Sequence, residues 1–165
     1  MSEAQAATAL EATQLQVVQA ELVRGKALPG PLLEVLLAIQ QRLGFVPPAA
    51  VPVIADGLNL SRAEVHGVKT FYHYFRQQPA GRHLVQLCRA EACQAMGANS
   101  LAHHAQRRLG VDFHATSADG AVTLEAVFCL GNCARAPAMM VDGELHGCVT
   151  AQRFDAVINE LAGRS

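Results

Sequence analysis

The cysteines have the most distinctive chemistry in this chain, and four of the five form two pairs. One pair lies in CRAEAC, with four residues between the thiols, and the other lies in CLGNC, with three. Thirty-five residues separate the pairs. Clustered thiols in a chain without secretory features usually bind a metal or carry out redox chemistry. The sequence therefore predicts a single site built from Cys88, Cys93, Cys129 and Cys133.

The spacing of these pairs narrows the group that four thiolates could bind. A structural zinc site often has four cysteines, but its usual unit is C-x2-C, which neither pair has. Haem attachment requires C-x-x-C-H, a Rieske centre requires two histidines, and a thioredoxin-type redox pair requires C-x-x-C. Plant-type ferredoxins hold a [2Fe–2S] cluster partly through C-x4-C. The spacing thus favours a [2Fe–2S] cluster, while a zinc ion and unliganded thiols stay open as alternatives.

Three residues beside the cysteines could serve an anionic centre. Arg89 and Arg135 each supply a cation that could offset the negative charge of a thiolate-bound cluster. Gly131 lacks a side chain, so backbone amides there could face cluster sulfurs, and such hydrogen bonds raise a reduction potential. Ordinary solvated loop charge is the competing interpretation of both arginines.

The elements around the cysteines predict an α/β domain over residues 81–165. Each pair begins where a strand is expected to end, at HLVQLC and at AVTLEAVFC. The expected order is strand, helix, four strands and helix, which indicates one mixed sheet packed against helices. Since the carboxyl ends of parallel strands lie at one edge of a sheet, the two cysteine loops could meet there.

The first 80 residues have a helical pattern instead. Residues 1–26 are rich in Ala and Gln and could form either a helix or a flexible tail. Residues 27–80 predict a small bundle, in which GFVPP ends one helix and a Ser61–Glu64 capping box begins another. We expect this last helix to present one apolar face, made of Val65, Val68, Tyr72 and Phe75.

Composition excludes several functions. Of the 165 residues, 51% are hydrophobic and 16% are charged, which is ample for a packed core. A formal net charge of −1 argues against a nucleic-acid partner. No run reaches the roughly twenty apolar residues of a membrane span, and the N-terminus lacks the features of a signal peptide. We therefore expect a cytoplasmic protein without a membrane span.

The two cysteine motifs together resemble those of the thioredoxin-like [2Fe–2S] ferredoxins, in which C-x4-C precedes a segment like CLGNCARAPAMMVDG. From about residue 30 onward the chain is similar to the small iron–sulfur subunit of the NADH-oxidising module of respiratory complex I. The stretch FYHYFRQQPAGRHLVQLCRAEACQ most resembles the gamma subunit of cytoplasmic, molybdenum-containing, NAD-dependent formate dehydrogenases. The resemblance implies a thioredoxin-like fold, with one cluster on Cys88, Cys93, Cys129 and Cys133.

The same resemblance implies an electron-transfer subunit of an oxidoreductase. The chain has no GxGxxG fingerprint and no nucleophile–base pair, so we expect no catalytic residue in it. The implied partners are a flavin- and NAD-binding beta-type subunit, holding FMN and [4Fe–4S] clusters, and an alpha-type subunit holding a molybdenum cofactor. Such a complex converts formate and NAD+ to CO2 and NADH. The alternatives are the equivalent subunit of complex I or of an NAD-linked hydrogenase, and a structural zinc module that serves assembly.

The fifth cysteine, the histidines and an aromatic cluster lie outside the two cysteine motifs. Cys148 is expected to be a buried, inert thiol on a strand, and the histidines are expected to be structural or solvated. The segment TFYHYF holds four of the eight aromatic residues, so these rings cannot all share one helical face. Phe71 and Tyr74 are expected to point away from the core, either onto the neighbouring domain or toward a partner subunit.

Overall fold

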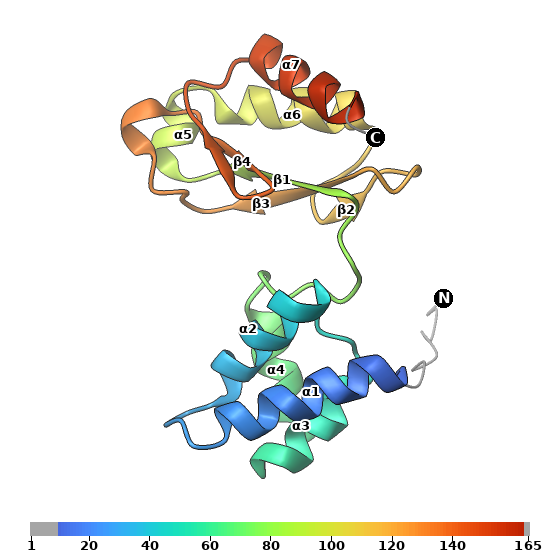
Figure 1. Ribbon diagram of the computed structural model, residues 1–165. Coiled ribbons are helices and arrows are strands. Elements are labelled where there is room, and N and C mark those ends of the chain that lie inside the picture. Colours follow the sequence, from blue (N-terminus) through green and yellow to red (C-terminus); the bar gives the residue numbers. More distant parts are fainter. Residues whose placement is uncertain (1–9, 164–165) are drawn as a thin grey trace, which may run out of the picture. The chain divides into compact units, whose positions relative to one another are not determined.

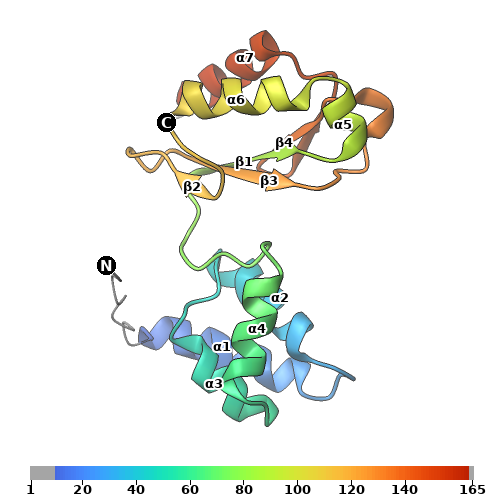
Figure 2. The same ribbon diagram turned by 180° about the vertical axis from the view of Figure 1, so that it is seen from behind.

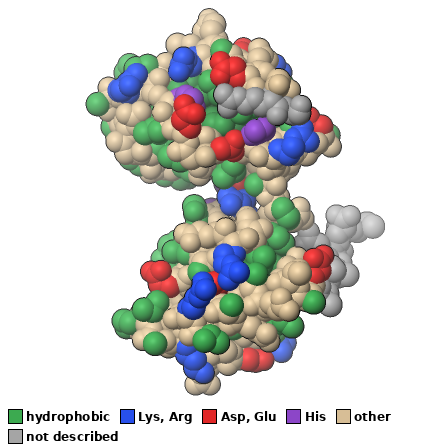
Figure 3. Space-filling model, in the orientation of Figure 1, with side chains coloured by type: hydrophobic (Ala, Val, Ile, Leu, Met, Phe, Trp, Pro, Cys, Tyr) green, Lys and Arg blue, Asp and Glu red, His purple; other side chains and the backbone are tan. Residues whose placement is uncertain are grey.

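The computed structural model describes residues 10–163, which form two compact units that divide between Pro79 and Ala80 (Figure 1). The first unit contains only helices, and the second contains a sheet covered by helices. Acidic and basic side chains are interspersed on the face of each unit that Figure 3 shows.

The first unit is a bundle of four helices around one apolar core. Val18 and Leu22 are buried in that core, so the segment expected as either a helix or a tail is a packed helix over most of its length. Residues 1–9 of that segment lie outside the described residues. The helices are α1 (Ala12–Gly25), α2 (Leu32–Leu43), α3 (Ala50–Leu58) and α4 (Arg62–Phe71).

Helix α4 begins where the sequence predicts. Ser61 Oγ accepts a hydrogen bond from the Glu64 backbone N–H at 3.1 Å, and the Glu64 carboxylate accepts one from the Ser61 backbone N–H at 2.8 Å. Each residue thus satisfies a backbone group that the first turn would leave unpaired. The predicted capping box is confirmed.

Helix α4 ends four residues earlier than its apolar pattern predicts. The prediction that Tyr72 and Phe75 continue its core face was wrong, because Tyr72 has an extended backbone and is 43% exposed. Phe75 is buried, but in the segment that follows the helix. Buried Gln40 holds that segment in place: its Nε2 donates to Tyr74 O at 2.8 Å, and its Oε1 accepts from Arg76 N at 2.7 Å.

Replacing Gln40 with Met should destabilise the helical unit by about 1–3 kcal/mol, because two partly buried hydrogen bonds to the backbone of residues 74 and 76 are lost. Met has a similar volume and cannot form either hydrogen bond. The free energy of unfolding in urea measures the effect. The neighbouring Gln41 is exposed, so Gln41→Met is the matched control, and an equal loss in both variants would contradict the assigned role of Gln40.

The second unit contains a five-stranded mixed sheet in the order β2-β3-β1-β4-β5. Strands β1 and β3 are parallel, and every other neighbouring pair is antiparallel. The strands are β1 (His83–Cys88), β2 (Ala115–Thr116), β3 (Val122–Val127), β4 (Met139–Val141) and β5 (Glu144–His146). The predicted fold class, an α/β unit with one mixed sheet after a helical bundle, is confirmed.

Two longer helices of the second unit lie against one face of the sheet, as both views show (Figures 1 and 2). Phe154 from the last helix is fully buried in the core that they share with Val85, Leu87 and Leu124 of the sheet. The helices of this unit are α5 (Glu91–Ala95), α6 (Ala98–Leu109) and α7 (Ala151–Ala162), and a short 3-10 helix, η1, spans Cys133–Arg135. This covered sheet fixes the strand ends that carry the cysteine loops.

Candidate metal centre

The parallel pairing of β1 and β3 brings the two cysteine pairs to one edge of the sheet. Cys88 is the last residue of β1 and lies opposite Val127, the last residue of β3. Cys129 follows two residues later. The Arg89 backbone N–H donates to Val127 O at 2.7 Å, and the Cys88 backbone N–H donates to Ala138 O at 3.0 Å. The start of the first cysteine loop is therefore hydrogen-bonded to both neighbouring segments.

The first cysteine pair is shielded from solvent. Cys88 is 3% exposed and Cys93, on α5, is 1% exposed. Small residues surround both thiols, chiefly Ala98, Ala136 and Ala138. Packing in this cluster shields both thiols from water.

The second pair lies in a tight loop and is exposed. Cys129 has a backbone φ of 131°, a conformation that residues with a side chain rarely adopt. The Gly131 backbone N–H donates to Cys129 Sγ at 3.3 Å, and Gly131 itself has a φ of 74°. Cys133 begins η1 with its Sγ 3.8 Å from Cys129 Sγ. The loop thus directs both sulfur atoms and one amide to the same place.

The four thiols influence one another's ionisation. Burial raises the pKa of Cys88, but hydrogen bonds from the Ala90 backbone amide, the Cys93 thiol and two further amides outweigh it, leaving this pKa below its ordinary value. Burial raises the pKa of Cys93, and its hydrogen bond with Cys88 raises it further. The hydrogen bond between Cys133 and Cys129 raises the pKa of Cys133, and the charges of Cys129 and Cys88 add to this effect. Four thiolates here would repel one another unless cations lay between them.

This donor set fits a [2Fe–2S] cluster. The cluster takes four thiolates, two on each iron, and the two loops supply the thiols as two separate pairs. The shielded pair and the exposed pair would together leave one side of a bound cluster open to a partner.

A comparison with protein families agrees with this geometry. Residues 18–162 match the model of the thioredoxin-like [2Fe–2S] ferredoxins. The chain belongs to this family. Its fold is accordingly thioredoxin-like, and its cofactor is one [2Fe–2S] cluster.

Several characterised proteins are similar to this family member. The E subunit of NADH-quinone oxidoreductase from Pseudomonas aeruginosa is 41% identical over 117 residues, covering 71% of this chain and 70% of that protein. The corresponding protein of Escherichia coli K12 is 32% identical over 149 residues, covering 90% of each chain. The NADP-reducing hydrogenase subunit HndA of Solidesulfovibrio fructosivorans is 30% identical over 131 residues, covering 79% of this chain and 77% of that subunit.

A solved structure of an NAD+-reducing [NiFe]-hydrogenase in the H2-reduced state has the same fold, with a TM-score of 0.64 at 22% identity. The match covers 79% of this chain but only 22% of the hydrogenase chain. At this level of identity the likeness shows the fold alone.

The two arginines beside the cysteine motifs have different surroundings. Arg89 is the residue directly after β1, and its side chain is half-buried. Its Nη2 donates to Asn99 Oδ1 at 3.0 Å, and its guanidinium lies 5.3 Å from the centre of the Phe113 ring. The Arg89 guanidinium therefore connects the strand to α6. Arg135 lies in η1 and is exposed.

The prediction that Cys148 is a buried strand residue was wrong. Strand β5 ends at His146, two residues earlier, and the Cys148 side chain is exposed. The Cys148 backbone N–H donates to Arg135 O at 2.6 Å, so this segment lies against η1, and Cys148 has a φ of 53°. The fifth cysteine therefore lies in a segment that supports the loop of Cys133.

The sequence interpretation missed Gly147 and two exposed apolar residues. A Cβ atom on Gly147 would lie 2.8 Å from both Arg135 Cβ and Asn132 Nδ2, so only glycine fits against the second cysteine loop. Phe128 is 78% exposed beside Cys129, and Met96 is 63% exposed shortly after α5. Nothing in the residues next to Gly147 indicates that a glycine is required there, whereas Phe128 could have been noticed as a large apolar residue directly before a loop cysteine.

No helix in the described part of the chain is both long and apolar enough to span a bilayer.

Replacing Gly147 with Ala should displace η1 and loosen the cluster. Outer-shell changes at metal sites typically reduce metal affinity by about 10- to 100-fold, so we expect iron loss to a chelator to accelerate by about tenfold. The decay of visible absorbance in the presence of the chelator measures this rate. Gly67→Ala is the control, because no atom lies within 4 Å of its added Cβ. Equal decay in the two variants would contradict the assigned role of Gly147.

Proposed function

We propose that this chain is an electron-transfer subunit of an NAD-linked oxidoreductase complex, with its cluster held by Cys88, Cys93, Cys129 and Cys133. The observation that carries this proposal is the convergence of two cysteine pairs at the carboxyl edge of β1 and β3, in a member of a [2Fe–2S] family. The similar proteins from Pseudomonas and Solidesulfovibrio are subunits of NADH- and NADP-linked oxidoreductases.

The exposed side of the cysteine site supports electron transfer to a partner subunit. Cys129 and Cys133 are exposed, so a cluster bound there would lie close to the surface of this unit. Phe128 and Met96 add exposed apolar area beside the cysteine motifs, and such area is typical of a surface that is covered in a complex. A bound [2Fe–2S] cluster supplies one-electron chemistry.

Residues of this chain would control the access of water to the cluster and its reduction potential. Burial of Cys88 and Cys93 excludes water from one side of the site. The Gly131 amide, which donates to Cys129 Sγ, would stabilise the added negative charge of the reduced state and so raise the reduction potential. Exposed Arg135 and half-buried Arg89 would contribute positive charge at longer range.

For the parent complex we propose a cytoplasmic, NAD-dependent formate dehydrogenase. The support is the resemblance of FYHYFRQQPAGRHLVQLCRAEACQ to its gamma subunit. The partner subunits would then hold FMN, [4Fe–4S] clusters and the molybdenum cofactor, and the flavin would be the redox partner of this chain. The equivalent role in complex I or in an NAD-linked hydrogenase is the second candidate, which the names of the similar proteins support about equally.

The spectrum of the anaerobically purified chain tests the cofactor and its site. We expect a red-brown protein with about two irons per chain and a rhombic spin-one-half EPR signal after dithionite reduction. A colourless chain containing zinc and no iron would overturn the electron-transfer function and leave an assembly role.

Affinity purification of the tagged chain from its native cells tests the parent complex. We expect it to retain a flavoprotein and a molybdenum-containing subunit, and the eluate to reduce NAD+ with formate. Reduction by hydrogen, or retention of quinone-reducing membrane subunits, would replace the formate dehydrogenase assignment with the second candidate.

A further inference from the structure

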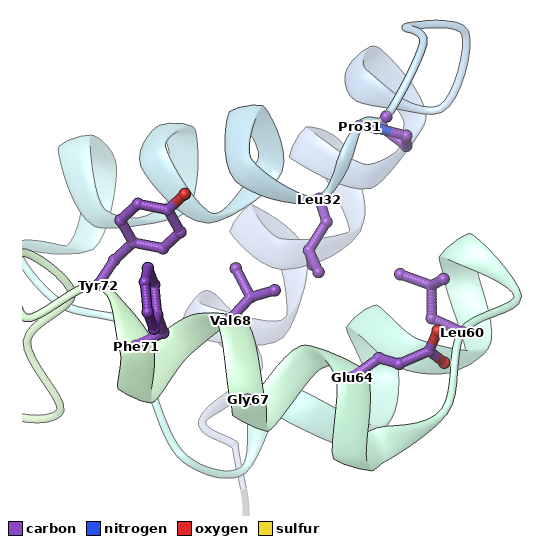
Figure 4. Close-up of a pocket in the computed structure, with 9 residues that line it drawn as sticks. Pro31, Leu32, Leu60, Glu64, Gly67, Val68, Phe71 and Tyr72 are labelled. Atoms are coloured by element: carbon purple, nitrogen blue, oxygen red, sulfur yellow. The ribbon is translucent and has the colours of Figure 1, made fainter.

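An apolar groove crosses the surface of the helical unit, with a volume of about 670 Å³. One wall comes from α4 and the other from the start of α2 and the loop before it (Figure 4). Leu32 of α2 and Val68 of α4 lie between the two ends of the groove, with Leu60 and Glu64 at one end and Phe71 and Tyr72 at the other. This groove lies in a different unit from the cysteine site.

Large apolar side chains at the groove are exposed to water. Phe71 is 74% exposed and Tyr72 is 43% exposed, and the two rings meet edge to face with centres 5.0 Å apart. Phe71 is the last residue of α4 and Tyr72 follows it with an extended backbone, so both rings line the groove where the helix ends. Covering apolar area of this kind with another surface lowers the free energy of the system and so favours binding.

The α4 wall of the groove has no side chain at Gly67. Gly67 is an interior residue of α4, where glycine costs about 1 kcal/mol relative to alanine. No atom lies within 4 Å of the position that a Cβ would occupy there. The glycine is therefore not required by packing within the unit, but it allows another backbone to approach α4 closely.

One charged side chain lines the groove. Glu64 is exposed, and its hydrogen bonds with the Ser61 backbone and hydroxyl keep the pKa of its carboxyl below the ordinary value. The carboxylate is thus negatively charged near neutral pH. A ligand that places a lysine or arginine at this end of the groove would complement it.

We propose that this groove binds an amphipathic helix of a partner subunit, with apolar side chains against Leu32, Val68 and Phe71 and a basic side chain beside Glu64. The α2 and α4 walls have backbones hydrogen-bonded within their own helices, so they offer no edge for an added strand. A helix brings its own satisfied backbone and suits a groove that follows about two turns of α4.

The chain's own N-terminus is a poor match for this groove. Residues 1–9 contain Glu3, no lysine or arginine, and only Met1 as a large apolar residue. A partner helix with a basic residue fits the charge and the walls better. The inference rests on the proposed function as a subunit of a complex, but it does not depend on the cluster.

Site-specific photo-crosslinking in the native complex tests the occupant. A benzoyl-phenylalanine at position 71 keeps an aromatic side chain at the rim, and one at exposed position 66, outside the groove, is the control. We expect position 71 alone to crosslink to a helical segment of another subunit that has spaced apolar residues and a lysine or arginine. Crosslinks to a second copy of this chain or to residues 1–9, or none in a retained complex, would overturn the proposal.

Matched variants test the groove itself. Gly67→Leu fills it and should lower retention of the crosslinked subunit by at least about tenfold, whereas His66→Leu adds the same side chain outside it and should have no effect. Glu64→Gln keeps the capping interaction, removes the charge and should weaken retention by about 2- to 5-fold at low salt. The variants should fold normally and keep the cluster spectrum, so a failure here stays separate from the proposed electron-transfer function. Full retention by Gly67→Leu would overturn the inference.

Discussion

Replacing Cys133 with Ser is expected to abolish the stable [2Fe–2S] cluster while the chain stays folded. A serine hydroxyl is far less readily ionised than a thiol and is a poor ligand for iron–sulfur centres. Only three thiolates would remain. Because Cys133 is exposed, its replacement removes little packing. We expect iron to fall from about two to below about 0.5 per chain, with loss of visible absorption and of the EPR signal.

Cys148→Ser is the control for this prediction. Cys148 is also exposed and is hydrogen-bonded through its backbone to the segment of Cys133, but it belongs to neither cysteine pair. It should keep about two irons per chain and an unchanged spectrum. Normal iron in Cys133→Ser, or loss of iron in Cys148→Ser alone, would show that the ligand set is assigned incorrectly.

Replacing Phe154 with Ala is expected to cost about 3–5 kcal/mol in the free energy of unfolding of the α/β unit. Phe154 is 0% exposed between α7 and the sheet, and its ring meets the His104 ring edge to face with centres 6.1 Å apart. Removing it leaves a cavity that the rigid sheet cannot close. Urea unfolding of the cluster-loaded chain under anaerobic conditions measures the loss.

Phe128→Ala is the matched control, because it removes the same side chain from a 78% exposed position in the same unit. We expect its free energy of unfolding to change by no more than about 0.5 kcal/mol. A loss below about 1 kcal/mol in Phe154→Ala, or equal losses in the two variants, would contradict the assignment of Phe154 to the core.

Local sequence features predicted most of the helices and strands that position the cysteine site. Hydrophobic periodicity within short windows predicted the five strands and the helices α6 and α7 of the second unit, but not the short helices α5 and η1, and two residues three apart predicted the start of α4. The meeting of the cysteine loops could be predicted because parallel strands end at a common edge. Each of these features depends on neighbours in the sequence or on a general rule of topology.

Other features depend on contacts between distant segments. Gln40 is hydrogen-bonded to Tyr74 and Arg76, more than thirty positions away, and this segment follows the end of α4, where Tyr72 is exposed at the groove. Arg135 and Gly147 meet in the same way, which draws Cys148 out of the predicted strand. The hydrophobic periodicity of a short segment cannot predict contacts between segments that are far apart in the sequence.

The sequence by itself therefore determined the two cysteine pairs, and the resemblance of their motifs indicated the family and its cofactor, because a motif of thiols at fixed spacings is readable without any knowledge of packing. Only the tertiary structure decided that Cys88 and Cys93 are shielded while Cys129, Cys133 and Cys148 are exposed. Burial is set by what other parts of the chain place around a side chain, and those parts lie far away in the sequence.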